Sequence, residues 1–156
     1  MSLGYEEILE GTPASRQSPG ARHELICDRL HSLVGASLVG VSTSTLLSRR
    51  TQVVLASGNS FRPDLAILTA ATGKLWLAAE IVQAGDHHTD TVIKKALYEE
   101  LRLPRLWMLD PRYDNVEVYH GSEYGLILKS ILAGRELLTE SLMPGLQATI
   151  AELFKP

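Results

Sequence analysis

Two acids and a lysine in the middle of the chain have the side chains that hydrolysis of a phosphodiester bond requires. Asp64 stands at the start of the short apolar run Leu65 to Leu68, Glu80 lies inside a second run, Leu75 to Val82, and Lys94 follows in a helical pattern. Carboxylate oxygens are hard ligands that suit Mg²⁺ or Mn²⁺ better than zinc. Such a metal polarises a phosphoryl oxygen and lowers the pKa of a bound water, and a lysine stabilises the developing charge. The pattern predicts a divalent-metal site with Asp64 and Glu80 as ligands.

Carboxylates in buried strands need partners, and the sequence leaves two possibilities open. An unpaired carboxylate loses several kcal/mol of solvation when it is buried, and Glu80 has no cation beside it in the sequence. Either the two acids meet at a solvent-open edge of a sheet, where a divalent ion screens both charges, or each pairs with a basic residue such as Arg62 or Lys94.

The helical pattern after Glu80 strengthens the metal-site interpretation. Asp90, Lys94 and Tyr98 recur every four residues, so they share one face of a helix. Two isolated acids are a weak signal because many proteins have them, whereas this helical face makes the set more specific. The pair His87-His88 lies among further acids and suggests zinc instead. Because adjacent histidines point in different directions, we do not favour a zinc site there.

The composition limits the function classes. The 156 residues fit a single domain, 1–156, and 45% hydrophobic with 21% charged residues is ordinary for a packed core. A formal net charge of −3 argues against a protein that coats nucleic acid by bulk charge, although it allows an enzyme with a local basic patch. The single cysteine, Cys27, excludes an internal disulfide. With no signal peptide and no apolar run long enough to span a membrane, we expect the protein in the cytoplasm.

Apolar periodicity and turn residues predict an α/β fold, with a mixed β-sheet flanked by helices and an N-terminal β-hairpin. The hairpin is expected between Tyr5 and Gln17. A helix is expected from a Ser18 N-cap, with Pro19 at its first position, to Gly35. The remaining predicted elements are strands at 38–43, 51–57, 65–68, 75–82, 105–110, 116–119 and 124–131, and helices at 90–103 and about 150–154.

Four basic residues allow both a functional and a purely structural interpretation. His23 and His31 fall outside the apolar stripe of the first helix, and we favour a solvent-facing or partner-facing role over metal binding for both. Arg49-Arg50 lies between two predicted strands, where an exposed hairpin turn is favoured over a phosphate contact.

The order and spacing of several segments resemble a known family. Arg62-Pro63-Asp64, followed by Glu80 in an apolar strand, resembles the PD-(D/E)XK nuclease superfamily with its restriction-endonuclease-like fold. More narrowly, nearly the whole chain is similar to the bacterial Uma-two family of restriction endonuclease-like proteins. The segments that carry this resemblance are Tyr5 to Gly11, Ser18 to Ile26, Lys94 to Tyr98, Leu106 to Pro111, Leu142 to Leu146 and Ala151 to Phe154.

The resemblance implies roles for four residues. Asp64 and Glu80 correspond to the metal ligands of the family, and Glu7 to an extra acid from the N-terminal strand. Lys94 corresponds to the family's lysine, four residues before Tyr98. The implied cofactor is Mg²⁺ or Mn²⁺, and the implied substrate is DNA.

Two features depart from the usual pattern. The superfamily's lysine normally lies two residues after the second acid, where this chain has Val82, so the lysine must come from the following helix. Lys94 has the four-residue spacing to Tyr98 that matches the family's lysine, and Lys95 does not. The loop Gln83 to His88 replaces the Ser-Pro-Ser-like loop of the family, which puts substrate contacts in question.

Three hypotheses follow. The first is a Mg²⁺-dependent endonuclease that hydrolyses DNA, acting as a homodimer because the two strands of a duplex call for two sites. The second is a catalytically inactive nuclease fold that binds nucleic acid or a protein partner. The third is an inert α/β domain whose acids are salt-bridged. The first requires positions 64, 80 and 94 to converge within a few ångströms of a common point that is open to water.

Overall fold

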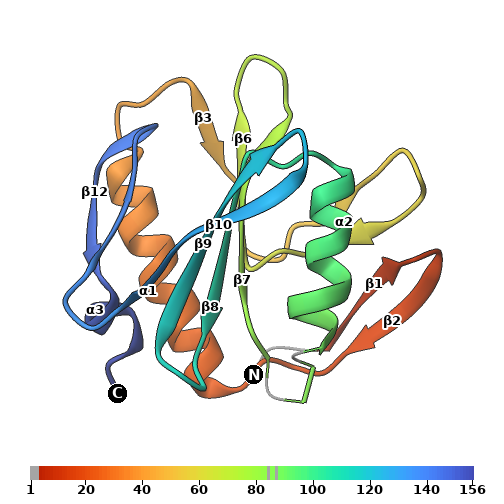
Figure 1. The fold of residues 1–156 in the computed structure, drawn as a ribbon, viewed down its shortest axis with the longest axis horizontal. Helices are drawn as coiled ribbons and strands as arrows, with labels where there is room; N and C mark the ends of the chain where they lie inside the picture. Colours follow the sequence, from red (N-terminus) through yellow and green to blue (C-terminus); the bar gives the residue numbers. More distant parts are fainter. Residues whose placement is uncertain (1–3, 84, 87) are drawn as a thin grey trace.

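A six-stranded mixed sheet forms the centre of the computed structural model, which describes residues 4–83, 85–86 and 88–156 (Figure 1). Its strand order is β10-β9-β8-β7-β6-β3, and neighbouring strands are antiparallel except for the parallel pair β7–β8. The predicted mixed sheet is therefore confirmed. Its strands are β3 (Ser44–Leu46), β6 (Leu65–Thr69), β7 (Leu75–Ile81), β8 (Arg105–Asp110), β9 (Asn115–Ser122) and β10 (Gly125–Ala133).

The predicted N-terminal hairpin is also confirmed. Strands β1 (Tyr5–Leu9) and β2 (Thr12–Arg16) are antiparallel. Glu10 and Gly11 connect them with φ values of 53° and 76°, as a two-residue turn between right-twisted strands requires. The hairpin extends into a second sheet with the short strands β5 (Ser60–Phe61) and β4 (Val53–Val54).

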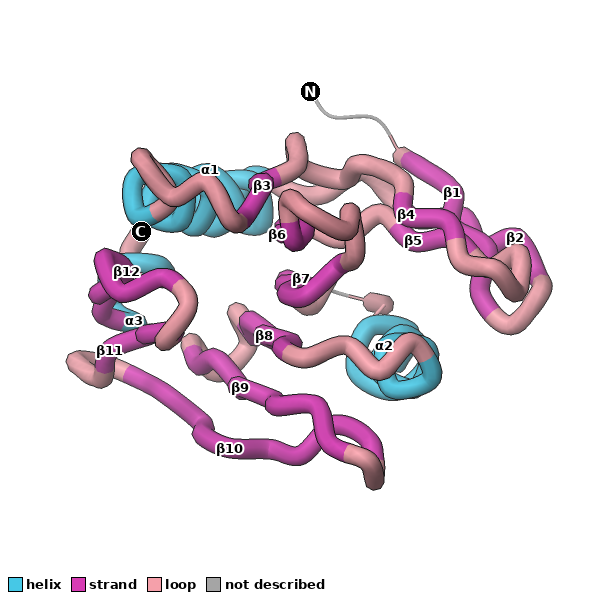
Figure 2. Tube along the Cα trace, turned by 90° about the horizontal axis from the view of Figure 1, so that it is seen from above, coloured by secondary structure: helices cyan, strands magenta, loops and turns pink. Residues whose placement is uncertain are grey.

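Helices cover both faces of the central sheet (Figure 2). On one face lie α1 (Ala21–Ser37), α3 (Ile150–Phe154) and the strand pair β11 (Leu137–Glu140) and β12 (Met143–Thr149). On the other lies α2 (Lys94–Glu100), preceded by the π-helical segment η1 (Thr89–Ile93), with the β1–β2 hairpin beside it. No helix in the described ranges is both long and apolar enough to cross a membrane.

Alternation along β7 decides which face of the sheet carries its acid. Leu77, Ala79 and Ile81 pack into the core on the α1 side, whereas Ala78 and Val82 pack into the core on the α2 side. Side chains two residues apart share a face of a strand. Glu80 therefore faces α2, the helix that begins with Lys94.

Several predicted boundaries were wrong, for identifiable reasons. Helix α1 begins at Ala21 with Gly20 as its N-cap, so Ser18 is not the cap, and the helix continues through Gly35. No strand forms at 38–43, where the chain turns, and β3 follows only at Ser44. The predicted strand at 51–57 shortens to β4, and β3 and β4 pair with β6 and β5 rather than with each other. Their β-branched residues favour a strand, but β-propensity takes effect only where a neighbouring strand is available. The pair β11–β12 was not predicted.

Candidate active site

The pairing of β6 with β7 brings the two predicted acids together. Leu65 lies opposite Ala79 in this antiparallel pair, so Asp64, immediately before β6, lies beside the end of β7 that carries Glu80. The backbone N–H of Ile81 donates to Asp64 Oδ2 at 2.9 Å. Asp64, immediately before β6, thus stands beside the end of β7 that carries Glu80.

Lys94 lies between two of the predicted acids. Its Nζ is 2.8 Å from Glu7 Oε2 and 2.6 Å from Glu80 Oε1. The hydroxyl of Tyr98, one turn further along the helix, donates to the same Glu80 oxygen at 2.6 Å. Lys95 instead pairs with Glu99 at 3.2 Å on the partly exposed side of α2. The structure therefore joins Glu7 of β1, Glu80 of β7 and Lys94 of α2, and it separates Lys95 from them.

A second cation extends this cluster toward the loop after β7. Arg16 on β2 donates to Glu7 Oε1 at 2.8 Å and to Asp90 Oδ1 at 2.6 Å. The other oxygen of Asp90 accepts from the backbone N–H of Gln83 at 3.0 Å. Arg62 contributes only its backbone N–H, which donates to Glu7 Oε2 at 2.8 Å. Arg62 was one of the expected partners of the acids, but its guanidinium instead donates to a backbone oxygen, that of Arg50.

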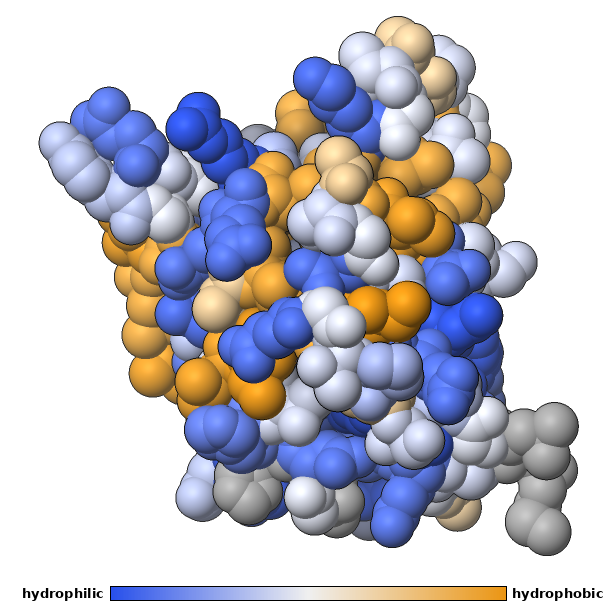
Figure 3. Space-filling model, turned by 90° about the vertical axis from the view of Figure 1, so that its right-hand side faces the viewer, coloured by the Kyte–Doolittle hydropathy of each residue, from blue (hydrophilic) through white to orange (hydrophobic). Residues whose placement is uncertain are grey.

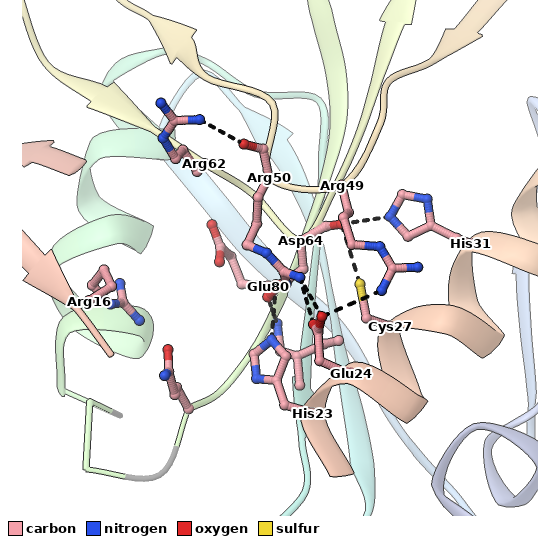
Figure 4. A network of polar contacts seen from close by, with 12 residues as sticks. Arg16, His23, Glu24, Cys27, His31, Arg49, Arg50, Arg62, Asp64 and Glu80 are labelled. Carbon is pink, nitrogen blue, oxygen red and sulfur yellow. Dashed lines mark hydrogen bonds and ion pairs between the residues drawn. The ribbon is translucent and has the colours of Figure 1, made fainter. Parts of the chain in front are cut away.

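Asp64 has two side-chain partners that sequence reasoning did not assign to it (Figure 4). His23 Nε2 lies 2.9 Å from Asp64 Oδ1, and Arg50 donates to the same oxygen at 3.0 Å. Arg50 also donates to both carboxylate oxygens of Glu24, at 2.6 and 2.8 Å. It holds a φ of 55°, which costs a non-glycine residue about 1–3 kcal/mol. Arg50 therefore bridges Asp64 and Glu24 from a strained backbone position.

The expectations for these residues were therefore wrong. His23 is 8% exposed rather than solvent-facing, and the Arg50 side chain is 12% exposed rather than part of an open turn. His31 also turns inward, with its Nε2 2.6 Å from the backbone oxygen of Asp64. Hydrophobic periodicity carried no signal for these contacts, because α1 meets β6 through tertiary packing far apart in the sequence.

The pKa values of the buried groups indicate that Glu80 has less neighbouring positive charge than its burial requires. Burial raises the pKa of Glu80 to about 8; Lys94 opposes this, and the neighbouring acids add to it. For Asp64, burial is outweighed by the hydrogen bond and charge of His23 and by the Ile81 N–H, so its pKa is lowered. Burial works against ionisation of Lys94 as well, but the charges of Glu80 and Glu7 raise its pKa. Three buried carboxylates, those of Glu7, Glu80 and Asp90, share the charges of Lys94 and Arg16, and among the described residues Glu80 has an ion pair only with Lys94.

The predicted opening to water is absent, which corrects the sequence-based expectation. Asp64 and Glu80 are each 2% exposed and Lys94 is 0% exposed. The possibility that the acids pair with basic residues is the one that the structure adopts. Within the described ranges, no group of three or more His, Cys, Asp or Glu side chains is arranged to hold a metal ion. His87, part of the zinc alternative, lies outside these ranges. The donor set itself, carboxylate oxygens from adjacent strands, suits Mg²⁺.

A central mixed sheet with helices on both faces and an N-terminal strand pair makes this an α/β protein. The sequence profile of the Uma2 family, described as "Putative restriction endonuclease", matches residues 5–151, and the chain therefore belongs to this family. A solved structure described as a "putative nuclease belonging to DUF820", from Anabaena variabilis ATCC 29413, has a similar fold with a TM-score of 0.79. It is 16% identical, and the match covers 96% of this chain and 89% of that one. No curated protein matches the chain.

Proposed function

We propose that the protein is a Mg²⁺- or Mn²⁺-dependent endonuclease that hydrolyses phosphodiester bonds of DNA. The observation that carries this proposal is the convergence of Glu7 and Glu80 on Lys94 from three separate elements, with Asp64 on the adjoining strand. Family membership supports the same function, because the profile spans residues 5–151.

Asp64 and Glu80 would hold the ion, with Glu7 as an additional acid. A bound Mg²⁺ or Mn²⁺ supplies a polarised phosphoryl oxygen and an activated water. The shortage of positive charge at Glu80, whose pKa burial and neighbouring acids raise to about 8, is what a cation would relieve. Lys94, held at 2.8 Å by Glu7, would stabilise negative charge that develops on the phosphate.

The closed geometry defines what must change before a substrate binds. Arg50 occupies Asp64 Oδ1, and Lys94 lies between Glu7 and Glu80. Both cations must therefore give up part of these contacts to a metal ion. Glu24 offers Arg50 a second partner, so Arg50 stays paired when it leaves Asp64.

Cleavage of supercoiled plasmid tests the proposal. We expect nicking that requires Mn²⁺ or Mg²⁺ and that is lost in Asp64→Ala and in the isosteric Asp64→Asn. Asp28→Asn is the matched control, because its side chain is 60% exposed and pairs only at the surface in the described structure. Equal nicking by wild type and both Asp64 variants would identify the activity as a contaminant and reject the proposal.

One observation favours the alternative of a catalytically inactive nuclease fold that binds nucleic acid or a protein partner. All four predicted site residues, Glu7, Asp64, Glu80 and Lys94, are at most 2% exposed and ion-paired. An inactive binder would give a salt-sensitive gel shift without cleavage, since phosphate contacts release counterions. Metal-dependent cleavage that is lost in Asp64→Asn would exclude this alternative.

We also propose that the protein acts in the cytoplasm as a homodimer, since two strands of a duplex are cut most simply by two sites related by a two-fold axis. The edge strand β10 is a candidate contact, because Ile127, Leu128 and Ile131 are 44%, 44% and 55% exposed. The face shown in Figure 3, which is the right-hand side of Figure 1, also carries hydrophobic side chains among hydrophilic ones. Sedimentation as a monomer at micromolar concentration would contradict the dimer.

A further inference from the structure

A cavity of about 560 Å³ opens where α1 begins and the parallel strands β7 and β8 end. In Figure 1 these three ends meet at the lower edge of the sheet. In open α/β sheets, ligands bind outside the carboxyl ends of parallel strands, and small-molecule sites have volumes of roughly 300–1,000 Å³. Neither the predicted site residues nor the ion pairs described above account for this cavity, although His23 belongs to both places.

The N-terminus of α1 supplies hydrogen-bond donors to the cavity wall. Gly20 is the N-cap, and no side-chain hydrogen bond caps the helix. The first N–H groups of a helix have no partner within the helix, and together with the helix dipole they favour a bound anion such as phosphate. α1 extends over 17 residues, so its dipole is fully developed at this end.

Two buried side chains in the cavity wall have polar atoms that lack a partner. His23 is 8% exposed and Gln83 is 7% exposed, and both line the cavity. His23 Nδ1 and Gln83 Oε1 have no hydrogen-bond partner among the described residues. Buried polar atoms are nearly always satisfied, so an unpaired donor or acceptor in a cavity wall indicates a missing ligand or water.

The other residues that line the cavity include an apolar pair and two arginines. Val82 and Pro111 give an apolar wall against which a base can lie flat. Arg22 and Arg112 lie at the rim, with side chains 52% and 42% exposed. Arg22 pairs with Asp114, which is also exposed, and such surface pairs contribute only about 0–1 kcal/mol, so a phosphate can compete for this guanidinium group. Arg112 is held at the rim by a two-point contact with the buried Asp110, at 3.0 and 2.7 Å.

We propose that this cavity is a nucleotide subsite of the nuclease, an inference that rests on the proposed function. The phosphate binds at the first turn of α1 between Arg22 and Arg112, and the base lies against Val82 and Pro111 with an N–H donated to Gln83 Oε1. His23 forms the wall between the bound nucleotide and Asp64, to which its Nε2 is hydrogen-bonded at 2.9 Å.

Gly20 offers a substitution that closes the anion site without harming the fold. Gly20 is exposed, its φ of −73° and ψ of 171° suit any residue, and a Cβ there meets no atom within 4 Å. Gly20→Asp places a preferred N-cap carboxylate on the free N–H groups, so it stabilises the helix while repelling phosphate. Gly20→Ala is the matched control, because it leaves both the N–H groups and the charge unchanged.

Binding of deoxythymidine 5′-monophosphate, followed by backbone amide NMR in EDTA, tests the subsite independently of cleavage. We expect saturable shifts in the first turn of α1 for wild type and Gly20→Ala, and roughly tenfold or greater weakening in Gly20→Asp, which is about 1.4 kcal/mol. The melting temperature of Gly20→Asp should not fall.

Three outcomes would overturn the subsite. The first is an absence of saturable shifts at α1, and the second is equal binding by both Gly20 variants. The third is inorganic phosphate that binds as tightly as the nucleotide, because the base would then contribute nothing to binding. Because no metal or cleavage is involved, loss of the subsite and loss of the nuclease function are separate results.

Discussion

Lys94 is the residue whose removal most clearly distinguishes a metal site from a structural ion pair. It is 0% exposed and contacts Glu7 and Glu80 at 2.8 and 2.6 Å. Lys94→Met keeps most of the volume but removes the cation that pairs with Glu80 and one of the two cations that pair with Glu7. Breaking a buried ion pair costs about 3–5 kcal/mol. In a domain of this size each kcal/mol lowers the melting temperature by about 2–4 °C, so the expected loss is roughly 6–20 °C.

Added metal should restore part of this stability if the acids form a cation site. An ion present at a hundredfold excess over its Kd adds about 2.7 kcal/mol. The gain should be larger in Lys94→Met than in wild type, because in wild type the ion must displace the ammonium. Thermal melts with Mg²⁺ or with EDTA, at about pH 9 where Glu80 is ionised in the wild type, measure both effects.

Lys95→Met is the control, since it makes the same change one position along the same helix. Lys95 is partly exposed, forms an i,i+4 pair with Glu99 and lies 5.0 Å from the Tyr119 ring centroid. Its loss should cost no more than about 1 kcal/mol and should not respond to metal. A Lys94→Met variant that melts like Lys95→Met, or that metal stabilises no more than wild type, would contradict a cation site at these acids.

Three further predictions concern Glu80, Tyr98 and a helix end. Glu80 keeps its proton up to about pH 8 in the folded protein but releases it near pH 4.5 in the unfolded chain. The free energy of unfolding of the wild type should therefore fall as the pH rises between these values. Denaturant titrations without metal should show a flatter pH dependence for Glu80→Gln. Tyr98→Phe removes the 2.6 Å hydrogen bond to Glu80 and should cost about 1–3 kcal/mol in urea unfolding; an unchanged midpoint would mean that the bond contributes nothing. Thr149→Ala breaks the capping box with Glu152 and should lower the free energy of unfolding by about 1 kcal/mol while leaving plasmid cleavage intact.

The central strands and helices could be predicted because their sequences are locally consistent. The apolar runs around Asp64 and Glu80 became β6 and β7, and the four-residue spacing from Asp90 to Tyr98 did place Lys94 on the face that meets Glu80. These features depend on period and turn chemistry, which one sequence records directly. The side of the sheet that Glu80 faces comes from the structure, because β7 is a continuous apolar run that is buried on both faces.

The partners of the acids could not be predicted, because they come from elements distant in the sequence. His23 and Asp64 are 41 positions apart, and Arg16 and Asp90 are 74 apart. Long-range ion pairs leave no periodic pattern, so Arg50 and His23 were interpreted as solvent-facing. The depth of burial was missed for the same reason, since the β1–β2 hairpin covers the acids only after the whole chain has folded.

The most direct test of the metal site is a crystal of the protein soaked in Mn²⁺ and measured for anomalous scattering. We expect a peak between the carboxylates of Asp64 and Glu80, with Arg50 withdrawn from Asp64. Unchanged contacts of Lys94 and Arg50 at saturating Mn²⁺, with no peak at these acids, would contradict the metal site.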